Sequence, residues 1–314
     1  MELRYNPLTD EWVMVSATRQ SRPTVPEGVC PLCPGGPELP DEYDLVSFEN
    51  RFPALRREPP EVSSESPLFR KSPARGICEV VVYTREHDSS LAEMPIEQLH
   101  KLVKMWKDRT VSLARYKFIR YIFIFENRGR EVGATLDHPH GQIYAFPFIP
   151  KRIQAKVMSL EKAYLEFGGC VVCEIVKNEK NGQRVVVEND SFIAIVPFYA
   201  RFPYEVHVYP KRHVDNILKF DEKEEREFAF ILKDVTSRYD MLFKQPFPYM
   251  MMFFQSPVNW RDVSSFFHFH VEFAPPKRDA KRMKWMASVE TGTWSFINPK
   301  LPEEAAKELR EVKQ

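Results

Sequence analysis

The chain of 314 residues is long enough for two domains of ordinary size, each with its own core. Its formal net charge is +1, which gives no electrostatic reason to expect nucleic acid or an anionic membrane as a partner. The opening Met-Glu-Leu-Arg does not begin a signal peptide, and no apolar run reaches the roughly 18 residues of a membrane span. We therefore expect a cytoplasmic protein.

The first half of the chain mixes β-type runs with one amphipathic helix pattern, which is typical of an α+β unit. Apolar residues recur at helical spacing from Ile96 to Trp106, whereas residues 121–125 form a continuous apolar run. In chain order we expect strands near 12–15, 46–55 and 79–87, a helix over 95–115, and strands over 121–127 and from 138 onward.

After Pro150 the same order of features returns. The run 205–213 matches 79–87 at five of nine positions. The further matches are a run at 188–195, a helix pattern at 221–242, and strands at 250–254 and 268–276. We infer an internal duplication with domains at 1–150 and 151–314, each an antiparallel sheet with helices packed on it.

Four of the five cysteines form two Cys-x-x-Cys pairs, Cys30 with Cys33 and Cys170 with Cys173. This spacing lets one tight turn, or knuckle, present two thiolates to one metal ion. In a cytoplasmic chain, metal binding is favoured over disulfides. A thioredoxin-like redox pair is the alternative, but neither pair opens a recognisable strand-to-helix redox turn.

Two histidines, His138 and His140, lie two residues apart just before a strand-like run, so we expect them on one face. Pro139 would stiffen the backbone between them, and Gly141 would leave the main chain open to a ligand. Gln142 can donate hydrogen bonds without adding negative charge. This arrangement suits attack by an imidazole on a phosphate. Ordinary packing of strand histidines is the alternative.

Each half supplies two thiols and two imidazoles, a set that suits a closed structural Zn²⁺ site rather than a catalytic one. The two predicted ligand sets are Cys30, Cys33, His87 and His138, and Cys170, Cys173, His213 and His268. His100 and His207 are interpreted as packing or surface residues.

The second histidine of each pair, His140 or His270, remains as a candidate nucleophile. His270 is followed by Val271 and by the carboxylate of Glu272, which would repel a phosphate. His140 has no such neighbour, so we expect the first half to be the catalytic one.

These motifs together resemble the galactose-1-phosphate uridylyltransferases, a branch of the histidine-triad superfamily. The resemblance spans essentially the whole chain. It is carried by Arg4-Tyr5-Asn6-Pro7-Leu8 with Trp12, Cys30-x-x-Cys33, His87, Phe125-Glu126-Asn127, His138-Pro139-His140-Gly141-Gln142 and the segment 284–290. It implies a duplicated histidine-triad-like fold. It also implies exchange of UMP between UDP-glucose and galactose-1-phosphate through a covalent uridylyl-histidine.

The resemblance also implies roles for individual residues. His140 would be the nucleophile, with Gln142 stabilising charge on the phosphoryl oxygens. The other implied contacts are Asn50, Arg51 and Phe52 for uridine; Asn127, Gly133, Ala134 and Thr135 for ribose or phosphate; and Lys284, Glu290, Arg19 and Arg22 for the hexose phosphate. Some of the last group would act across the interface of a homodimer.

Two departures from the family pattern affect these expectations. Well-known members bind iron through an additional histidine, where this chain has Gln255, so we expect a second zinc ion instead. The segment 290–298 is similar to relatives that act on adenylylated sugars, which leaves an ADP-sugar phosphorylase or adenylyltransferase as the alternative. A nucleotide hydrolase and a zinc-knuckle nucleic-acid binder also remain open.

Overall fold

The structure is a computed structural model that describes residues 1–21 and 30–312. Its strands are β1 (Glu2–Asn6), β2 (Glu11–Val15), β3 (Val46–Glu49), β4 (Lys71–Pro73), β5 (Ile77–Val82), β6 (Tyr121–Arg128), β7 (His140–Phe146), β8 (Val185–Glu188), β9 (Phe192–Ile195), β10 (Val206–Pro210), β11 (Tyr249–Phe254) and β12 (His270–Ala274). The α-helices are α1 (Ile96–Ala114), α2 (Lys151–Phe167), α3 (Val171–Glu179), α4 (Glu222–Leu242), α5 (Ser288–Thr293) and α6 (Pro302–Glu311). Short 3₁₀ helices are η1 (Ala17–Ser21), η2 (Arg130–Val132) and η3 (Ile217–Lys219).

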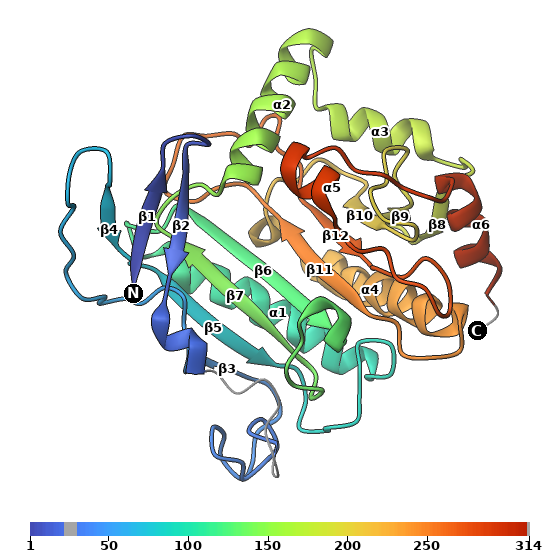
Figure 1. Cartoon of the computed structure of the whole chain (residues 1–314). Helices are drawn as coiled ribbons and strands as arrows, with labels where there is room; N and C mark the ends of the chain where they lie inside the picture. The colour runs from blue at the N-terminus through green and yellow to red at the C-terminus, as the bar shows by residue number, and fades with distance from the viewer. Residues whose placement is uncertain (22–29, 313–314) are drawn as a thin grey trace.

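One nine-stranded antiparallel sheet runs through both halves (Figure 1). Its order is β3-β5-β7-β6-β11-β12-β10-β9-β8, so β3, β5, β7 and β6 are mirrored by β9, β10, β12 and β11. This mirrored order confirms the predicted duplication. The sequence did not predict that the two half-sheets join, through pairing of β6 with β11.

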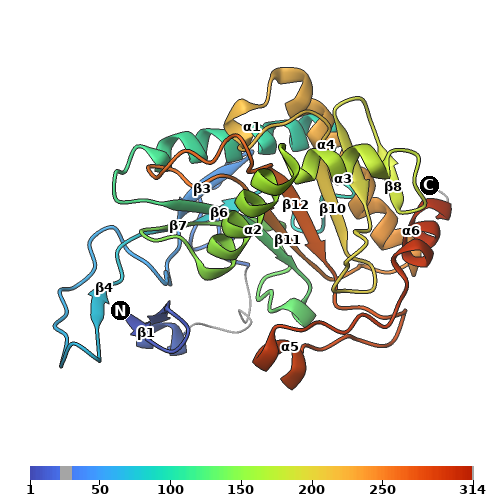
Figure 2. The ribbon, with the colours of Figure 1, turned by 90° about the horizontal axis from the view of Figure 1, so that it is seen from above.

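Helices cover the two faces of this sheet differently. Helices α1 and α4 lie side by side on one face, where the main core includes Trp106, Phe228 and Phe253 (Figure 2). Helices α2 and α3 pack against the opposite face, which carries Phe146 of β7. His140 shares that face with Phe146, because the two lie six residues apart on one strand. In the described part of the chain, no helix is long and apolar enough to cross a membrane.

Local sequence signals fix the helix ends. Helix α4 begins with a capping box in which Asp221 and Glu224 each accept from the other's backbone N–H. Helix α2 follows Pro150 and ends at Gly168, whose φ of 70° is the left-handed conformation that glycine adopts without strain.

The second cysteine pair is not a loop knuckle as predicted. Cys170 is the N-cap of α3, and Cys173 lies in the first turn of that helix. The segment 171–179 places Val172 and Val176 on the buried face, a helical spacing that the sequence analysis missed.

Residues 79–87 and 205–213 match in sequence, but their equivalent side chains point to opposite faces of the sheet. Val82 pairs with His140, whereas Val208 pairs with Val271, one residue further along than the equivalent His270. A slip of one residue turns every side chain to the other face. Tyr83 therefore packs toward α1, while its sequence counterpart Tyr209 packs on the opposite face.

Candidate active site

The ring of His140, the first residue of β7, is held by the main chain. Its Nδ1 lies 2.8 Å from the carbonyl oxygen of His138, so Nδ1 carries the proton and donates. The other ring nitrogen, Nε2, then carries the lone pair that a nucleophile requires. The half-buried side chain lines three cavities.

The first cavity lies between the turn of Cys30 and Cys33 and the start of β7. Its apolar wall includes Leu32 from that turn and Val80 from β5. Asn50 donates from Nδ2 to Oε1 of Gln142 at 3.4 Å, which leaves the amide nitrogen of Gln142 as a donor. Residues that the sequence analysis assigned to the site and that line this cavity are Asn50, Arg51, Phe52, Thr135, His140 and Gln142.

A second cavity, of about 210 Å³, adjoins the same two residues, His140 and Gln142. Arg19 reaches it from η1 and donates to the carbonyl oxygen of Phe52 at 2.8 Å. The other predicted residues that line it are Asn127, Gly133, Ala134 and Thr135. Segments far apart in sequence therefore converge on His140, and a positive charge lies among them.

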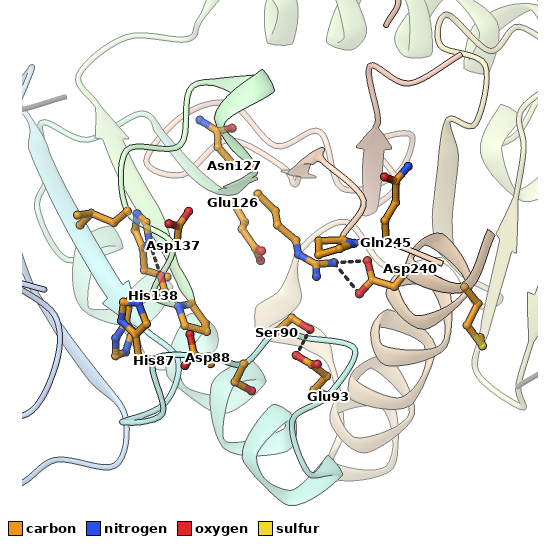
Figure 3. Close-up of a pocket in the computed structure, with 18 of the residues that line it drawn as sticks. His87, Asp88, Ser90, Glu93, Glu126, Asn127, Asp137, His138, Asp240 and Gln245 are labelled. Carbon is orange, nitrogen blue, oxygen red and sulfur yellow. Dashed lines mark hydrogen bonds and ion pairs between the residues drawn. The ribbon is translucent and has the colours of Figure 1, made fainter. Parts of the chain in front are cut away.

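The third cavity is the largest, at about 780 Å³, and Figure 3 shows it. The carboxyl of Glu126 points into it, and an ion pair of Arg128 with Asp240, 2.8 Å long, crosses from β6 to α4. Burial raises the pKa of Glu126 to about 7, and Tyr249 donates to this carboxyl at 3.1 Å.

Gly141 is a glycine for a different reason from the one predicted. Its Cα–H points to the face of the sheet that α1 and α4 cover, and a Cβ atom there would lie 2.1 Å from the hydroxyl oxygen of Tyr83. Close packing beneath the strand, and not access of a ligand to the main chain, excludes a larger residue.

The first four predicted ligands converge, with their donor atoms within 4.8 Å of one another. The Sγ of Cys33 lies 3.3 Å from Nδ1 of His87 and 3.6 Å from Nδ1 of His138. An S–N edge of a zinc tetrahedron is about 3.5 Å, given Zn–S near 2.3 Å and Zn–N near 2.0 Å. The Nε2 of His138 donates to the carbonyl oxygen of Thr84 at 2.8 Å, so Nδ1 is available to a metal ion.

The second predicted set repeats this geometry. The Sγ of Cys173 lies 3.5 Å from Nδ1 of both His213 and His268. Each imidazole again donates from Nε2 to a carbonyl oxygen, that of Ser264 at 2.7 Å and that of Pro210 at 3.0 Å. Two Cys2His2 groups that could bind metal ions are thus confirmed, and both fit zinc by donor type and spacing.

His270 keeps the Nδ1–carbonyl hydrogen bond of His140, but its side chain is buried. Its Nδ1 lies 2.9 Å from the carbonyl oxygen of His268, as in the first half. Its Nε2, however, lies 2.7 Å from Nζ of Lys156, and the ring stacks on Phe254. Burial and the charge of Lys156 lower the pKa of His270 to about 3.

A third group of buried donors, Glu205, His207 and Glu272, adjoins His270. His207 faces this group because of the register slip, and it bonds to Glu205 at 2.7 Å. Lys156 bonds to Glu272 at 2.6 Å, and Arg152 pairs with the same carboxylate. Cationic side chains thus already balance the negative charge of Glu272, so we do not interpret this group as a metal site.

The remaining predicted residues lie elsewhere. Lys284 and Glu290 form a buried ion pair of 2.7 Å, and neither is among the residues that line the three cavities at His140. Arg22 lies outside the described residues.

Several residues that line the site were not predicted from the sequence. Tyr144 and Phe125 line the second cavity, and Leu32 and Glu38 line the first. Alternation along a strand could have identified Tyr144, because His140, Gln142 and Tyr144 share one face. No local signal indicates Glu38, which meets Arg51 only through the fold, at 3.9 Å.

The fold and this site define a duplicated α+β protein in which a histidine oriented to act as a nucleophile lies beside a Cys2His2 group. Two family models match the chain: the N-terminal domain of galactose-1-phosphate uridyl transferase over residues 1–150 and its C-terminal domain over 155–314. The chain therefore belongs to the galactose-1-phosphate uridylyltransferase family.

Individual relatives agree with this assignment. The chain is 62% identical to a galactose-1-phosphate uridylyltransferase of Thermotoga maritima, over 99% of this chain and 98% of the relative. A solved uridylyltransferase structure superposes with a TM-score of 0.91 at 34% identity, covering 99% of this chain and 98% of that one. An ADP-glucose phosphorylase from Arabidopsis thaliana, solved with bound ADP-glucose, has a TM-score of 0.78 at 26% identity, with both chains fully covered.

Proposed function

We propose that the protein exchanges UMP between UDP-glucose and galactose-1-phosphate through a covalent intermediate on His140. Membership of the uridylyltransferase family and the orientation of the His140 ring support this reaction. In the first step, Nε2 attacks the α-phosphorus, a P–N bond forms, and the P–O bond to glucose-1-phosphate breaks. In the second step, a phosphate oxygen of galactose-1-phosphate attacks the same phosphorus, and the P–N bond breaks.

The cavities beside His140 support distinct binding roles. We assign the uridine to the first cavity, with Asn50, Arg51 and Phe52, and the ribose and phosphates to the second. There, Gln142 and Arg19 would donate to phosphoryl oxygens as charge redistributes in the transition state. The Nδ1–H bond to the carbonyl of His138 holds the ring in place and keeps the proton off the attacking nitrogen.

We propose that both Cys2His2 groups bind zinc, about two ions per chain. Bound zinc would hold together the Cys30–Cys33 turn, the loop after β5 that carries His87, and His138 just before β7. Its role would be structural, because a four-ligand shell leaves no position for substrate. His138 would ligate zinc through Nδ1 while its carbonyl oxygen orients His140. The metal would thereby fix the nucleophile without taking part in the chemistry.

We also propose that the protein is a cytoplasmic homodimer. Within each subunit, the domains 1–150 and 151–314 would be joined through the shared sheet. Trp285, Met286 and Val289 are exposed on the segment of Lys284 and Glu290. Apolar side chains gathered on one exposed segment favour a protein interface. A partner subunit could then bring Lys284 and Glu290 to the hexose phosphate.

Isotope exchange tests both the transfer reaction and the preference for uridine over adenosine. Labelled glucose-1-phosphate should exchange into UDP-glucose with no acceptor sugar present, and much more slowly into ADP-glucose. His140→Gly should abolish the exchange, whereas His100→Gln, a change in α1 on the other side of the sheet, should retain it. Faster exchange with ADP-glucose would favour the adenylyl alternative, and loss of UDP-glucose to water without acceptor would indicate a hydrolase.

A further inference from the structure

We infer that Tyr144 is a positioning residue that holds Arg19 toward the phosphate beside His140. The inference rests on the proposed function, since it concerns the same nucleotide. Tyr144 follows Gln142 by two residues on β7, and it lines the second cavity with Arg19 and His140.

The tyrosine ring is itself held firmly. It packs edge-on against Phe125, with ring centroids 5.3 Å apart, and it contacts Phe146 on its own strand. Tyr144 also pairs directly with Cys78 on the neighbouring β5. Its hydroxyl is therefore fixed by the sheet that carries the nucleophile.

Arg19 comes from a separate element, the short helix η1. Its Nη1 donates to the hydroxyl oxygen of Tyr144 at 3.4 Å and to the carbonyl oxygen of Phe52 at 2.8 Å. Phe52 lines the first cavity, so Arg19 connects the walls of the two cavities.

The chemistry of these two contacts suits an arginine that must bind an anion. Both acceptors are neutral, so neither cancels the guanidinium charge, as a carboxylate would. In the described part of the chain both bonds use Nη1, which leaves Nε and Nη2 to donate to phosphoryl oxygens. Holding a long side chain in advance reduces the conformational entropy lost when phosphate binds.

Packing alone makes a different prediction for Tyr144→Phe. The phenylalanine ring would preserve the contacts with Phe125 and Phe146, and only the hydroxyl would be lost. If the hydroxyl merely fills space, its loss would leave ligand binding unchanged. If it orients Arg19, its loss would weaken the binding of a phosphate specifically.

The test is a double-mutant cycle on binding, read by calorimetry with UMP and with uridine as ligands. Wild type, Tyr144→Phe, Arg19→Ala and the double variant are compared. We expect Tyr144→Phe to raise the Kd for UMP about fivefold to tenfold, the size of one hydrogen bond, and to leave the Kd for uridine unchanged. In the Arg19→Ala background the same change should alter the Kd for UMP less than about twofold, since its target is absent.

Transfer kinetics and a matched variant complete the test. The kcat/KM for UDP-glucose should fall with the UMP affinity, mainly through KM. Tyr164→Phe makes the same chemical change on α2, where the ring packs on Phe266, and should match wild type. Equal losses for UMP and uridine, additive losses in the cycle, or no effect of Tyr144→Phe would overturn the inference. Failure of the wild type to bind UMP would instead overturn the proposed function.

Discussion

Replacing Gly141 by alanine is expected to displace the strand that carries His140. The added Cβ atom would lie 2.1 Å from the hydroxyl oxygen of Tyr83 and 3.0 Å from the carbonyl oxygen of Phe125. Because unbonded heavy atoms pack at about 3.5 Å and this pair would lie 2.1 Å apart, the strand or the tyrosine must move by about 1.4 Å. Overpacking of this kind costs about 1–3 kcal/mol of unfolding free energy.

Two assays should register this displacement. The melting temperature of Gly141→Ala should fall by about 2–6 °C, at about 2 °C per kcal/mol for a chain of this size. Transfer activity should fall about 100-fold, since a misplacement of about 1 Å at a reacting group costs that much.

A second substitution identifies the cause. Tyr83→Phe removes the overlapping oxygen while keeping the packed ring, so the single change should cost less unfolding free energy than Gly141→Ala. Gly141→Ala combined with Tyr83→Phe should regain most of the lost stability and activity. Gly169→Ala, where nothing lies within 4 Å of the added atom, is the matched control. Wild-type behaviour of Gly141→Ala, or no rescue by Tyr83→Phe, would refute the packing argument.

Three further predictions concern the metals, the buried acid and the sealed half. Elemental analysis should find about two zinc ions per chain, and Cys33→Ser and Cys173→Ser should each lose one; iron in either group would contradict the assignment. Because burial raises the pKa of Glu126 from 4.5 to about 7, the folded state keeps a proton that the unfolded state releases. Unfolding free energy should therefore fall by about 3 kcal/mol as pH rises through that window, and a Glu126→Gln variant that keeps the same fall would refute this cause. Lys156→Met should lower stability by about 3 kcal/mol, since it removes a partner of buried Glu272, and should leave the His140 adduct intact. Exposed Lys162→Met should cost less than about 0.5 kcal/mol, and equal losses for the two lysines would contradict the buried pairing.

The sequence predicted the parts of the molecule whose chemistry depends on residue type and short spacing. Cys30 and Cys33 can reach one ion from one turn, and each half also supplies histidines in the same order, so residue type and order indicated the ligand sets. The duplication was visible because both halves keep the same order of elements. Bringing Asn50 and Thr135 to His140 required the resemblance to a family as well.

Features set by long-range packing could not be read from the sequence. The one-residue slip of β10 against β12 reverses the faces of His207 and Tyr209 although their neighbours match the first half. Lys156 reaches His270 from a helix more than 100 positions earlier, so no local pattern reports that the second histidine is sealed. Glu126 reads as an ordinary strand residue until β6 pairs with β11 and encloses it.

The central claim is that His140 becomes bonded to the nucleotide during transfer. Intact mass spectrometry after mixing the protein with UDP-glucose alone measures this directly. We expect one added UMP per chain in the wild type, its loss on adding galactose-1-phosphate, and no adduct in His140→Gly. An unmodified wild type that still catalyses exchange, or an adduct that persists in His140→Gly, would contradict the account.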